Sequence, residues 1–229
     1  MREIRAATLA FVETMRCPGK PYGRYRYAEG VPEPTLYSST YAALTRHLYR
    51  DLGSLSPGER GEWIDYLRSH QDDDGLFRDP AIWGEGWYEG DPEWCGRRHL
   101  SGYVTMALAC LGAVPRKPLR VLEPFLKPGG MVRWLESRRW RDQTDYVGNE
   151  VLNLARLLQY ARDFLADGRC GPAVATMLDW MATHHLDPAT GLWGEMDLTD
   201  PEGLSRAVQA AKNFHNSLPS SVIDRKSVV

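Results

Sequence analysis

The feature of the sequence that most constrains its fold is a succession of amphipathic helical segments, joined by turns rich in glycine, proline and aromatic residues. Their apolar residues recur every three or four positions, a spacing typical of α-helices that bury one face. Strict alternation of apolar and polar residues, which marks half-buried strands, is absent. The sequence therefore predicts an all-α protein, with helical segments at about residues 1–15, 38–52, 57–70, 100–111, 118–137, 144–165, 171–184 and 201–216.

The start of one helix is marked clearly in the sequence. Ser56 can accept a free backbone N–H group of the first turn, Pro57 suits that turn, and Glu59 stands at the capping-box position. A later segment, residues 118–137, is interrupted at Pro128–Gly130, because proline cannot continue a helix. We therefore expect a helix from Pro57 and a break inside the later segment.

The helical segments come in pairs, and a tryptophan recurs in the second members as Trp63, Trp134 and Trp180. A single pair can bury its apolar face only against its neighbours, as in solenoids and toroids. The longest segment, residues 144–165, is apolar on most of its faces, so we expect it to be buried on most sides. The sequence predicts an α/α toroid, or partial α/α barrel, of repeated helix hairpins.

The composition excludes some classes of partner. Lys and Arg total 28 against 30 Asp and Glu, and the net charge of -2 gives no basic footprint for nucleic acid. No window approaches the roughly 20 apolar residues of a transmembrane helix. The four cysteines form no Cys-x-x-Cys pair, so neither a disulfide framework nor a zinc ribbon is predicted. We expect a soluble, cytoplasmic protein with no nucleic-acid partner and no transmembrane segment.

The turn after the segment 57–70 has a distinctive pattern. Its sequence runs from Tyr66-Leu67 to Gln71 and then through three aspartates to Gly75-Leu76-Phe77. This resembles the QW motif of terpenoid cyclases and the related turns of protein prenyltransferase β-subunits. A weaker copy, Gly191-Leu192-Trp193, lacks the glutamine. The resemblance implies an α/α toroid and covers about residues 34–216.

The residues of this turn have a structural role on chemical grounds alone. Gln71 can bond the backbone ends of adjacent helices, Gly75 permits a tight turn, and Phe77 can fill the seam. The string Asp72–Asp74 differs from the DxDD acid motif of squalene-hopene-type cyclases, and we expect these aspartates to be solvated turn residues. The zinc-ligand spacing of the prenyltransferases is not matched either. The resemblance therefore implies a fold and does not by itself assign a reaction.

We expect residues 1–219 to form a single helical-repeat domain. A closed toroid of the kind that the resemblance implies has more helix pairs than this sequence supplies. Residues 220–229 abandon the helical pattern. We therefore expect the domain to be a truncated fragment that forms an open ring, with an irregular and non-native tail.

The most unusual stretch of the chain, residues 83–99, combines three tryptophans and a tyrosine with four acidic residues. Loops often carry binding groups on a rigid scaffold, and aromatic rings beside carboxylates suit a sugar or a cation. The alternative is a covering flap whose rings pack on the rim of the toroid. The candidate substrate-binding residues here are Glu85, Trp87, Tyr88, Trp94, Arg97 and His99.

A metal site in the same stretch is not predicted. Asp91, Cys95 and His99 are spaced by four and are zinc-ligand types. However, Pro92 and Gly96 argue against the continuous helix that would bring them together, and no second cluster completes a site. The sequence indicates no particular cofactor.

Acidic residues also cluster at the start of the segment 144–165. In a toroid the ends of the inner helices open onto the central cavity, so Asp142, Asp145 and Glu150 are candidate catalytic acids and bases. Carboxylates at a helix N-terminus also stabilise the helix dipole, by about 0.3–1 kcal/mol each. Both roles remain open.

Three functions are compatible with these patterns. The first is a protein resembling terpenoid cyclases and prenyltransferases that binds or transforms a small molecule in a central cavity. The second is a carbohydrate-active α/α-barrel enzyme, to which the tryptophan-rich acidic loop is suited. The third is a non-catalytic helical-repeat binding scaffold. The expected partner is a small-molecule ligand, either isoprenoid or carbohydrate.

Overall fold

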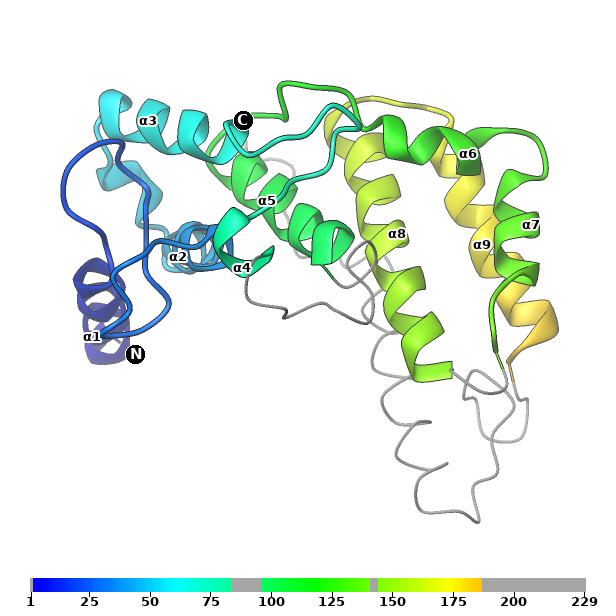
Figure 1. The fold of residues 1–229 in the computed structure, drawn as a ribbon, viewed down its shortest axis with the longest axis horizontal. Coiled ribbons are helices and arrows are strands. Elements are labelled where there is room, and N and C mark those ends of the chain that lie inside the picture. Colours follow the sequence, from blue (N-terminus) through cyan, green and yellow to red (C-terminus); the bar gives the residue numbers. More distant parts are fainter. Residues whose placement is uncertain (1, 84–95, 141–143, 187–229) are drawn as a thin grey trace, which may run out of the picture. The chain divides into compact units, whose positions relative to one another are not determined.

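The computed structural model describes residues 2–83, 96–140 and 144–186, and these are mostly helical (Figure 1). Within these ranges there is no β-strand, and extended segments meet only at isolated bridges such as Gln71–Phe77. The predicted all-α class is confirmed. None of the helices in these ranges is long and apolar enough to cross a membrane.

The described residues form two compact units, divided between Pro118 and Leu119. The expectation of a single domain over residues 1–219 stays a prediction. The helices of the first unit are α1 (Arg2–Thr14), α2 (Leu36–Leu48), α3 (Pro57–Arg68), α4 (Pro80–Trp83) and α5 (His99–Cys110), with the short 3-10 helix η1 (Leu52–Ser54). Those of the second unit are α6 (Glu123–Leu126), α7 (Gly130–Glu136), α8 (Thr144–Phe164) and α9 (Cys170–His184), after the 3-10 helix η3 (Arg120–Leu122).

The start of α3 follows from its capping residues. The Ser56 hydroxyl accepts the backbone N–H of Glu59, and the Glu59 carboxylate accepts the backbone N–H of Ser56 at 2.8 Å. This reciprocal pair satisfies two N–H groups that a helix start leaves without partners. The predicted break at Pro128–Gly130 is also present, since α6 ends before it and Gly129 adopts a φ of 67°.

The buried face of α2 differs in part from the apolar stripe of Tyr41, Leu44, Leu48 and Leu52 that helical spacing predicts for the segment 38–52. Leu48 is 75% exposed and Tyr41 is 40% exposed, whereas Ser39 and Ala43 are fully buried. The reason is that α2 packs closely along α5, and small side chains allow the two backbones to approach. Leu52 is buried and Leu44 packs against the core, so hydrophobic spacing alone places only half of the stripe correctly.

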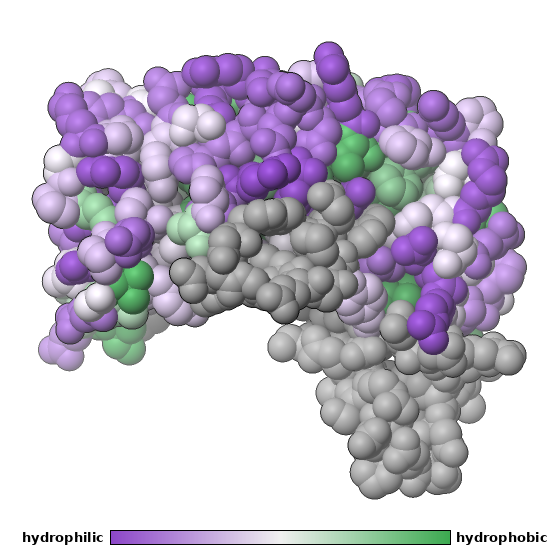
Figure 2. Space-filling view, in the orientation of Figure 1, coloured by the Kyte–Doolittle hydropathy of each residue, from purple (hydrophilic) through white to green (hydrophobic). Residues whose placement is uncertain are grey.

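The first helix shows the same kind of difference. The sequence places Ile4, Ala7, Phe11 and Met15 on one stripe, but only Met15 is buried. Ile4 and Phe11 are more than half exposed, and hydrophobic surface is visible at the position of α1 in Figure 2. The remaining described surface in that view is mainly hydrophilic.

The second unit is built around α8, which packs against α9. The prediction that this helix is buried on most sides is confirmed, because side chains on more than one of its faces are at most 5% exposed. These are Val147, Val151, Leu152, Leu154, Ala155, Leu157, Leu158 and Ala161.

Trp63 forms the centre of the core in the first unit. Its side chain has no exposed surface, and the rings of Tyr22 and Tyr25 lie 5.7 Å and 5.1 Å from it. Gly23 lies against the same indole ring: a Cβ atom at this position would stand 2.2 Å from it. The segment before α2 therefore closes over Trp63 only because residue 23 has no side chain.

We predict that Gly23→Ala lowers the free energy of unfolding by about 3 kcal/mol or more. The added methyl group overlaps the indole, and the φ of 95° disfavours any residue with a Cβ atom. Urea denaturation followed by circular dichroism measures the loss.

Gly30→Ala is the matched control, because Gly30 has a similar φ of 83° but a Cβ atom there would meet nothing within 4 Å. Its cost should be about 1 kcal/mol. Equal losses in the two variants would contradict the role given to Trp63.

Candidate functional site

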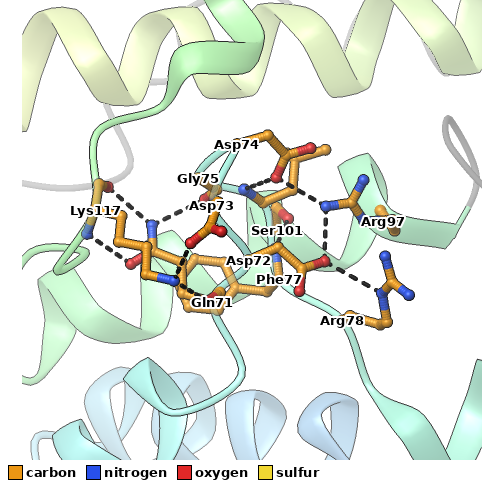
Figure 3. Close-up of polar contacts among 11 residues, drawn as sticks. Gln71, Asp72, Asp73, Asp74, Gly75, Phe77, Arg78, Arg97, Ser101 and Lys117 are labelled. Atoms are coloured by element: carbon orange, nitrogen blue, oxygen red, sulfur yellow. Dashed lines mark hydrogen bonds and ion pairs between the residues drawn. The ribbon is translucent and has the colours of Figure 1, made fainter.

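The turn between α3 and α4 is held by the amide of Gln71 (Figure 3). Its Nε2 donates to the carbonyl oxygens of Gly75 and Lys117, both at 2.9 Å, and its Oε1 accepts the backbone N–H of Lys117 at 2.8 Å. One side chain thus joins the turn to the chain beyond α5. Gln71 thus bonds backbone groups as predicted, but these belong to its own turn and to the loop after α5 rather than to the ends of helices.

The remaining turn residues also behave as their chemistry predicts. Gly75 has a φ of 94°, in the region that favours glycine, and Phe77 has no exposed surface. The backbone N–H of Phe77 donates to the Ser101 hydroxyl at 2.7 Å, which fastens the turn to α5 (Figure 3). The turn therefore has a structural role in positioning α5.

Arg97 lies just before α5 and is held by the aspartates of the same turn. It is only 6% exposed, and its Nη2 donates to Asp72 and Asp74, both at 2.8 Å (Figure 3). Asp73, by contrast, is 96% exposed at its side chain and pairs with Lys117 at 2.8 Å. The aspartates are thus turn residues that fix the chain entering α5. The substrate-binding role of Arg97 stays a prediction.

Four aromatic side chains gather where α2 and α5 begin, and we call Tyr37, Tyr41, His99 and Tyr103 the aromatic wall. The closest ring centroids are those of His99 and Tyr103, at 4.9 Å, and of Tyr41 and Tyr103, at 5.2 Å. Tyr37 contacts the other three rings at 5.8–6.2 Å. The pairing of Tyr37 with His99, and of Tyr41 with Tyr103 one turn later, shows that the starts of α2 and α5 lie side by side.

One hydrogen bond orients the imidazole of the aromatic wall. The Tyr37 hydroxyl and His99 Nδ1 are 2.7 Å apart, and this bond fixes the plane of the imidazole ring. Tyr37 is 6% exposed, Tyr41 is 40% exposed, and His99 and Tyr103 are half-buried. The wall therefore has a buried base and an accessible outer part.

The start of α2 is fixed by two side chains that bind its free backbone N–H groups. The Thr35 hydroxyl accepts the N–H of Ser38, and the buried Asp79 carboxylate accepts the N–H of Leu36 at 2.6 Å. Asp79 also accepts the N–H of Ala81 at 3.1 Å. Because the positions of the tyrosines on α2 depend on where the helix begins, these caps help to set the geometry of the aromatic wall.

Polar side chains behind the aromatic wall are bonded within the protein. The hydroxyl of Ser39 accepts the backbone N–H of Tyr25 at 3.1 Å, and that of Thr40 donates to the carbonyl of Tyr37 at 2.9 Å. Burial raises the pKa of the neighbouring Tyr66 to about 12, so its hydroxyl stays protonated at neutral pH. These groups support the packing of α2, whereas the aromatic wall reaches the surface.

Of the four residues in the aromatic wall, only His99 is a candidate on sequence grounds. The sequence pattern places Tyr41 in an apolar stripe and gives no role to Tyr37 or Tyr103. One signal could have found them, namely an aromatic pair with i,i+4 spacing at the start of α2 and again at the start of α5. That these pairs meet depends on how the starts of the two helices pack together.

The predicted loop residues Glu85, Trp87, Tyr88 and Trp94 lie outside the described residues. The same holds for two of the three residues with zinc-ligand spacing, Asp91 and Cys95. Across the part of the chain that the structure describes, no three His, Cys, Asp or Glu side chains are grouped as metal ligands.

Of the predicted catalytic residues in the second unit, only the Glu150 side chain is described. Asp142 lies outside the described residues, and Asp145 lies in α8 but its side chain is not described. Glu150 is 4% exposed, and Arg138 Nη1 is 3.1 Å and 3.4 Å from its two carboxylate oxygens. The guanidinium of Arg138 in turn lies over the ring of Trp134, 5.5 Å from its centroid. This arrangement compensates a buried charge, and the catalytic role of Glu150 stays a prediction.

A second ring cluster closes the C-terminal end of α9. His185 stacks on Trp140 with centroids 4.3 Å apart, and His184 stacks on Trp180 at 4.6 Å. The indole N–H of Trp140 donates to the Leu135 carbonyl at 2.8 Å. This cluster joins α9 to the chain after α7, and its packing explains the paired histidines without a ligand.

Comparisons with protein-family models, with curated proteins and with solved structures found no match to this chain.

We predict that Gln71→Ala lowers the free energy of unfolding by about 2–3 kcal/mol. The substitution leaves the N–H and carbonyl of Lys117 and the carbonyl of Gly75 without this partner, and buried polar groups that lose their bonds are costly. Chemical denaturation measures the effect. Asp73→Ala in the same turn is the control and should change stability by no more than about 0.5 kcal/mol, because Asp73 is solvated. A similar loss in both variants would show that Gln71 does not hold the turn.

Proposed function

We propose that this chain is an α/α-toroid protein that binds a small-molecule ligand against the aromatic wall, in a cavity lined by the first helices of successive pairs. The proposal combines the predicted repeat of helix hairpins with the position of the wall. It concerns binding and assigns no reaction.

The packing within each unit supports the toroid part of the proposal. In a toroid the first helices of successive pairs form an inner layer and the second helices form an outer layer. Within the first unit, α2 packs on α5, and both are first members of their pairs (Figure 1). Within the second unit, α7 packs on α9, and both are second members. Each unit by itself is thus consistent with the two-layer arrangement.

The observation that carries the binding part of the proposal is the partial exposure of the aromatic wall. Tyr41 keeps 40% of its surface accessible, although the first unit buries other large aromatic side chains such as Trp63 completely. Aromatic rings that keep a polar tip are common in binding surfaces, because they combine a large apolar area with hydrogen bonding. Tyr37 and His99 lie in the first turns of α2 and α5. In a toroid, the starts of the inner helices open onto the cavity.

We predict that Tyr41→Ala weakens ligand binding by at least about fivefold, since a tyrosine that the ligand covers at the centre of a contact contributes more than about 1 kcal/mol. A library of small molecules screened by ligand-observed NMR on the full chain supplies the ligand and the measurement. Helical content should be unchanged by circular dichroism, because Tyr41 is exposed.

The matched control for this prediction is Tyr27→Ala. Tyr27 is another tyrosine of the first unit, 62% exposed and outside the aromatic wall. Its replacement should leave binding unchanged. Ligands that bind the Tyr41→Ala and Tyr27→Ala variants as tightly as the parent chain would refute the proposed site.

A further inference from the structure

We infer that Asp79 and Ser101 are positioning residues of the aromatic wall, which hold the starts of α2 and α5 against one short segment of chain, residues 77–79. The meaning of this inference for ligand binding rests on the proposed function, because it concerns how the proposed site is assembled. The positioning itself can be measured without a ligand.

Two hydrogen bonds tie both helices to this segment. The backbone N–H of Phe77 donates to the Ser101 hydroxyl at 2.7 Å, and the Asp79 carboxylate accepts the backbone N–H of Leu36 at 2.6 Å. Leu36 is the first residue of α2, and Ser101 is the third residue of α5. A segment of three residues thus binds the first turns of the two helices that carry the aromatic wall.

Both bonds lie in the interior of the first unit. Phe77, Ser101 and Leu36 have no exposed surface, and Asp79 is only 4% exposed. A buried polar group that loses its partner has no water to replace it, so breaking such a bond is costly. The two bonds therefore resist a displacement of either helix start more strongly than bonds at the surface would.

The contact between α2 and α5 leaves their relative position to anchors of this kind. Ser39 and Ala43 on α2, and Gly102 on α5, are small and buried. Small side chains let two helices approach closely, but they offer few projections that interlock with the facing helix. Packing alone therefore does little to stop one helix from sliding along the other. The polar bonds at the helix starts supply that restraint.

The aromatic wall depends on this restraint because its members lie next to the anchored residues. Tyr37 directly follows Leu36, and His99 stands two positions before Ser101. The Tyr37 hydroxyl and His99 Nδ1 are 2.7 Å apart, and a displacement of about 1 Å would break this bond, since contacts beyond about 3.5 Å are no longer hydrogen bonds. The groups that fix Leu36 and Ser101 therefore also fix this ring pair.

The second oxygen of Asp79 keeps the carboxylate itself in place. Its Oδ1 accepts the backbone N–H of Ala81 at 3.1 Å, while Oδ2 accepts that of Leu36. A carboxylate bonded through both oxygens cannot rotate without losing a partner. Asparagine has a single side-chain oxygen, so Asp79→Asn can occupy only one of the two acceptor positions. This substitution therefore loosens the anchor while keeping the shape of the side chain.

The test measures the aromatic wall of the ligand-free full chain by NMR. The first readout is the ¹⁵N signal of His99 Nδ1, which reports its bond to Tyr37, and Tyr37→Phe gives the signal without that bond. The second readout is the cross-peak between the rings of Tyr41 and Tyr103. Asp79→Asn and Ser101→Ala should each move the His99 signal toward the Tyr37→Phe value and weaken the ring cross-peak.

The matched control is Thr105→Ala, in the same helix as Ser101. Thr105 is 1% exposed, and its hydroxyl donates to the Gly102 carbonyl at 3.0 Å without contacting residues 77–79. This variant also loses a buried hydroxyl and should be less stable to urea. The His99 signal and the ring cross-peak should nevertheless stay at the values of the parent chain.

A graded series guards against variants that do not fold. Ser101→Cys keeps the size of the side chain and a weak acceptor, so it should move the His99 signal in the same direction as Ser101→Ala but less far. Asp79→Ala, which keeps no acceptor, should move the signal further than Asp79→Asn. Circular dichroism shows which variants are folded, and the comparison is made among those.

The outcomes separate this inference from the proposed function. A His99 signal that stays at the parent value in folded Asp79 and Ser101 variants, while their stability falls, overturns the inference, because the two residues would then only stabilise the fold. An equal displacement in Thr105→Ala overturns it as well. Neither readout involves a ligand, so a library screen that finds none counts against the proposed function and leaves the positioning roles standing.

Discussion

The hydrogen bonds of the Gln71 side chain are the interaction on which the arrangement of the first unit depends. One amide binds the turn after α3 and both backbone groups of Lys117, beyond α5. The same turn fastens the start of α5 through Ser101 and fixes the chain before it through Arg97. Since α5 begins at His99, the turn determines where that imidazole lies. A structural turn and the candidate site are therefore parts of one arrangement.

The aromatic wall is a product of close helix packing. Small residues such as Ser39 and Ala43 on α2 let the backbone of α5 approach, and the larger rings of Tyr41 and Tyr103 are left at the edge of the contact. Because the starts of the two helices lie side by side, aromatic pairs with the same spacing meet ring to ring. The carboxylates and the guanidinium nearby are engaged with one another or with backbone groups. Among the described residues, the wall thus presents aromatic rings that also carry polar atoms.

The second unit shows how a candidate residue can have a structural explanation. Glu150 is predicted as a catalytic group from its place near the start of α8, and it is a buried carboxylate bound by Arg138. A buried charge needs such a partner whether or not it takes part in chemistry. The position of Glu150 along α8 marks it as a candidate in the sequence. The residue that compensates its buried charge, Arg138, lies before the helix, and only the tertiary structure brings the two together.

The sequence by itself determined the helical class, the capping box at Ser56, the break before Gly130, the burial of α8 and the roles of Gln71, Gly75 and Phe77. These depend on local spacing and on the conformational preferences of single residues, which act over a few positions of the chain. The faces that α1 and α2 bury, the partners of Arg97 and Glu150, and the meeting of Tyr37 with His99 were decided only by the tertiary structure. They depend on which helices pack together and how closely, and residues 62 positions apart in the chain come into hydrogen-bonding distance only through that packing.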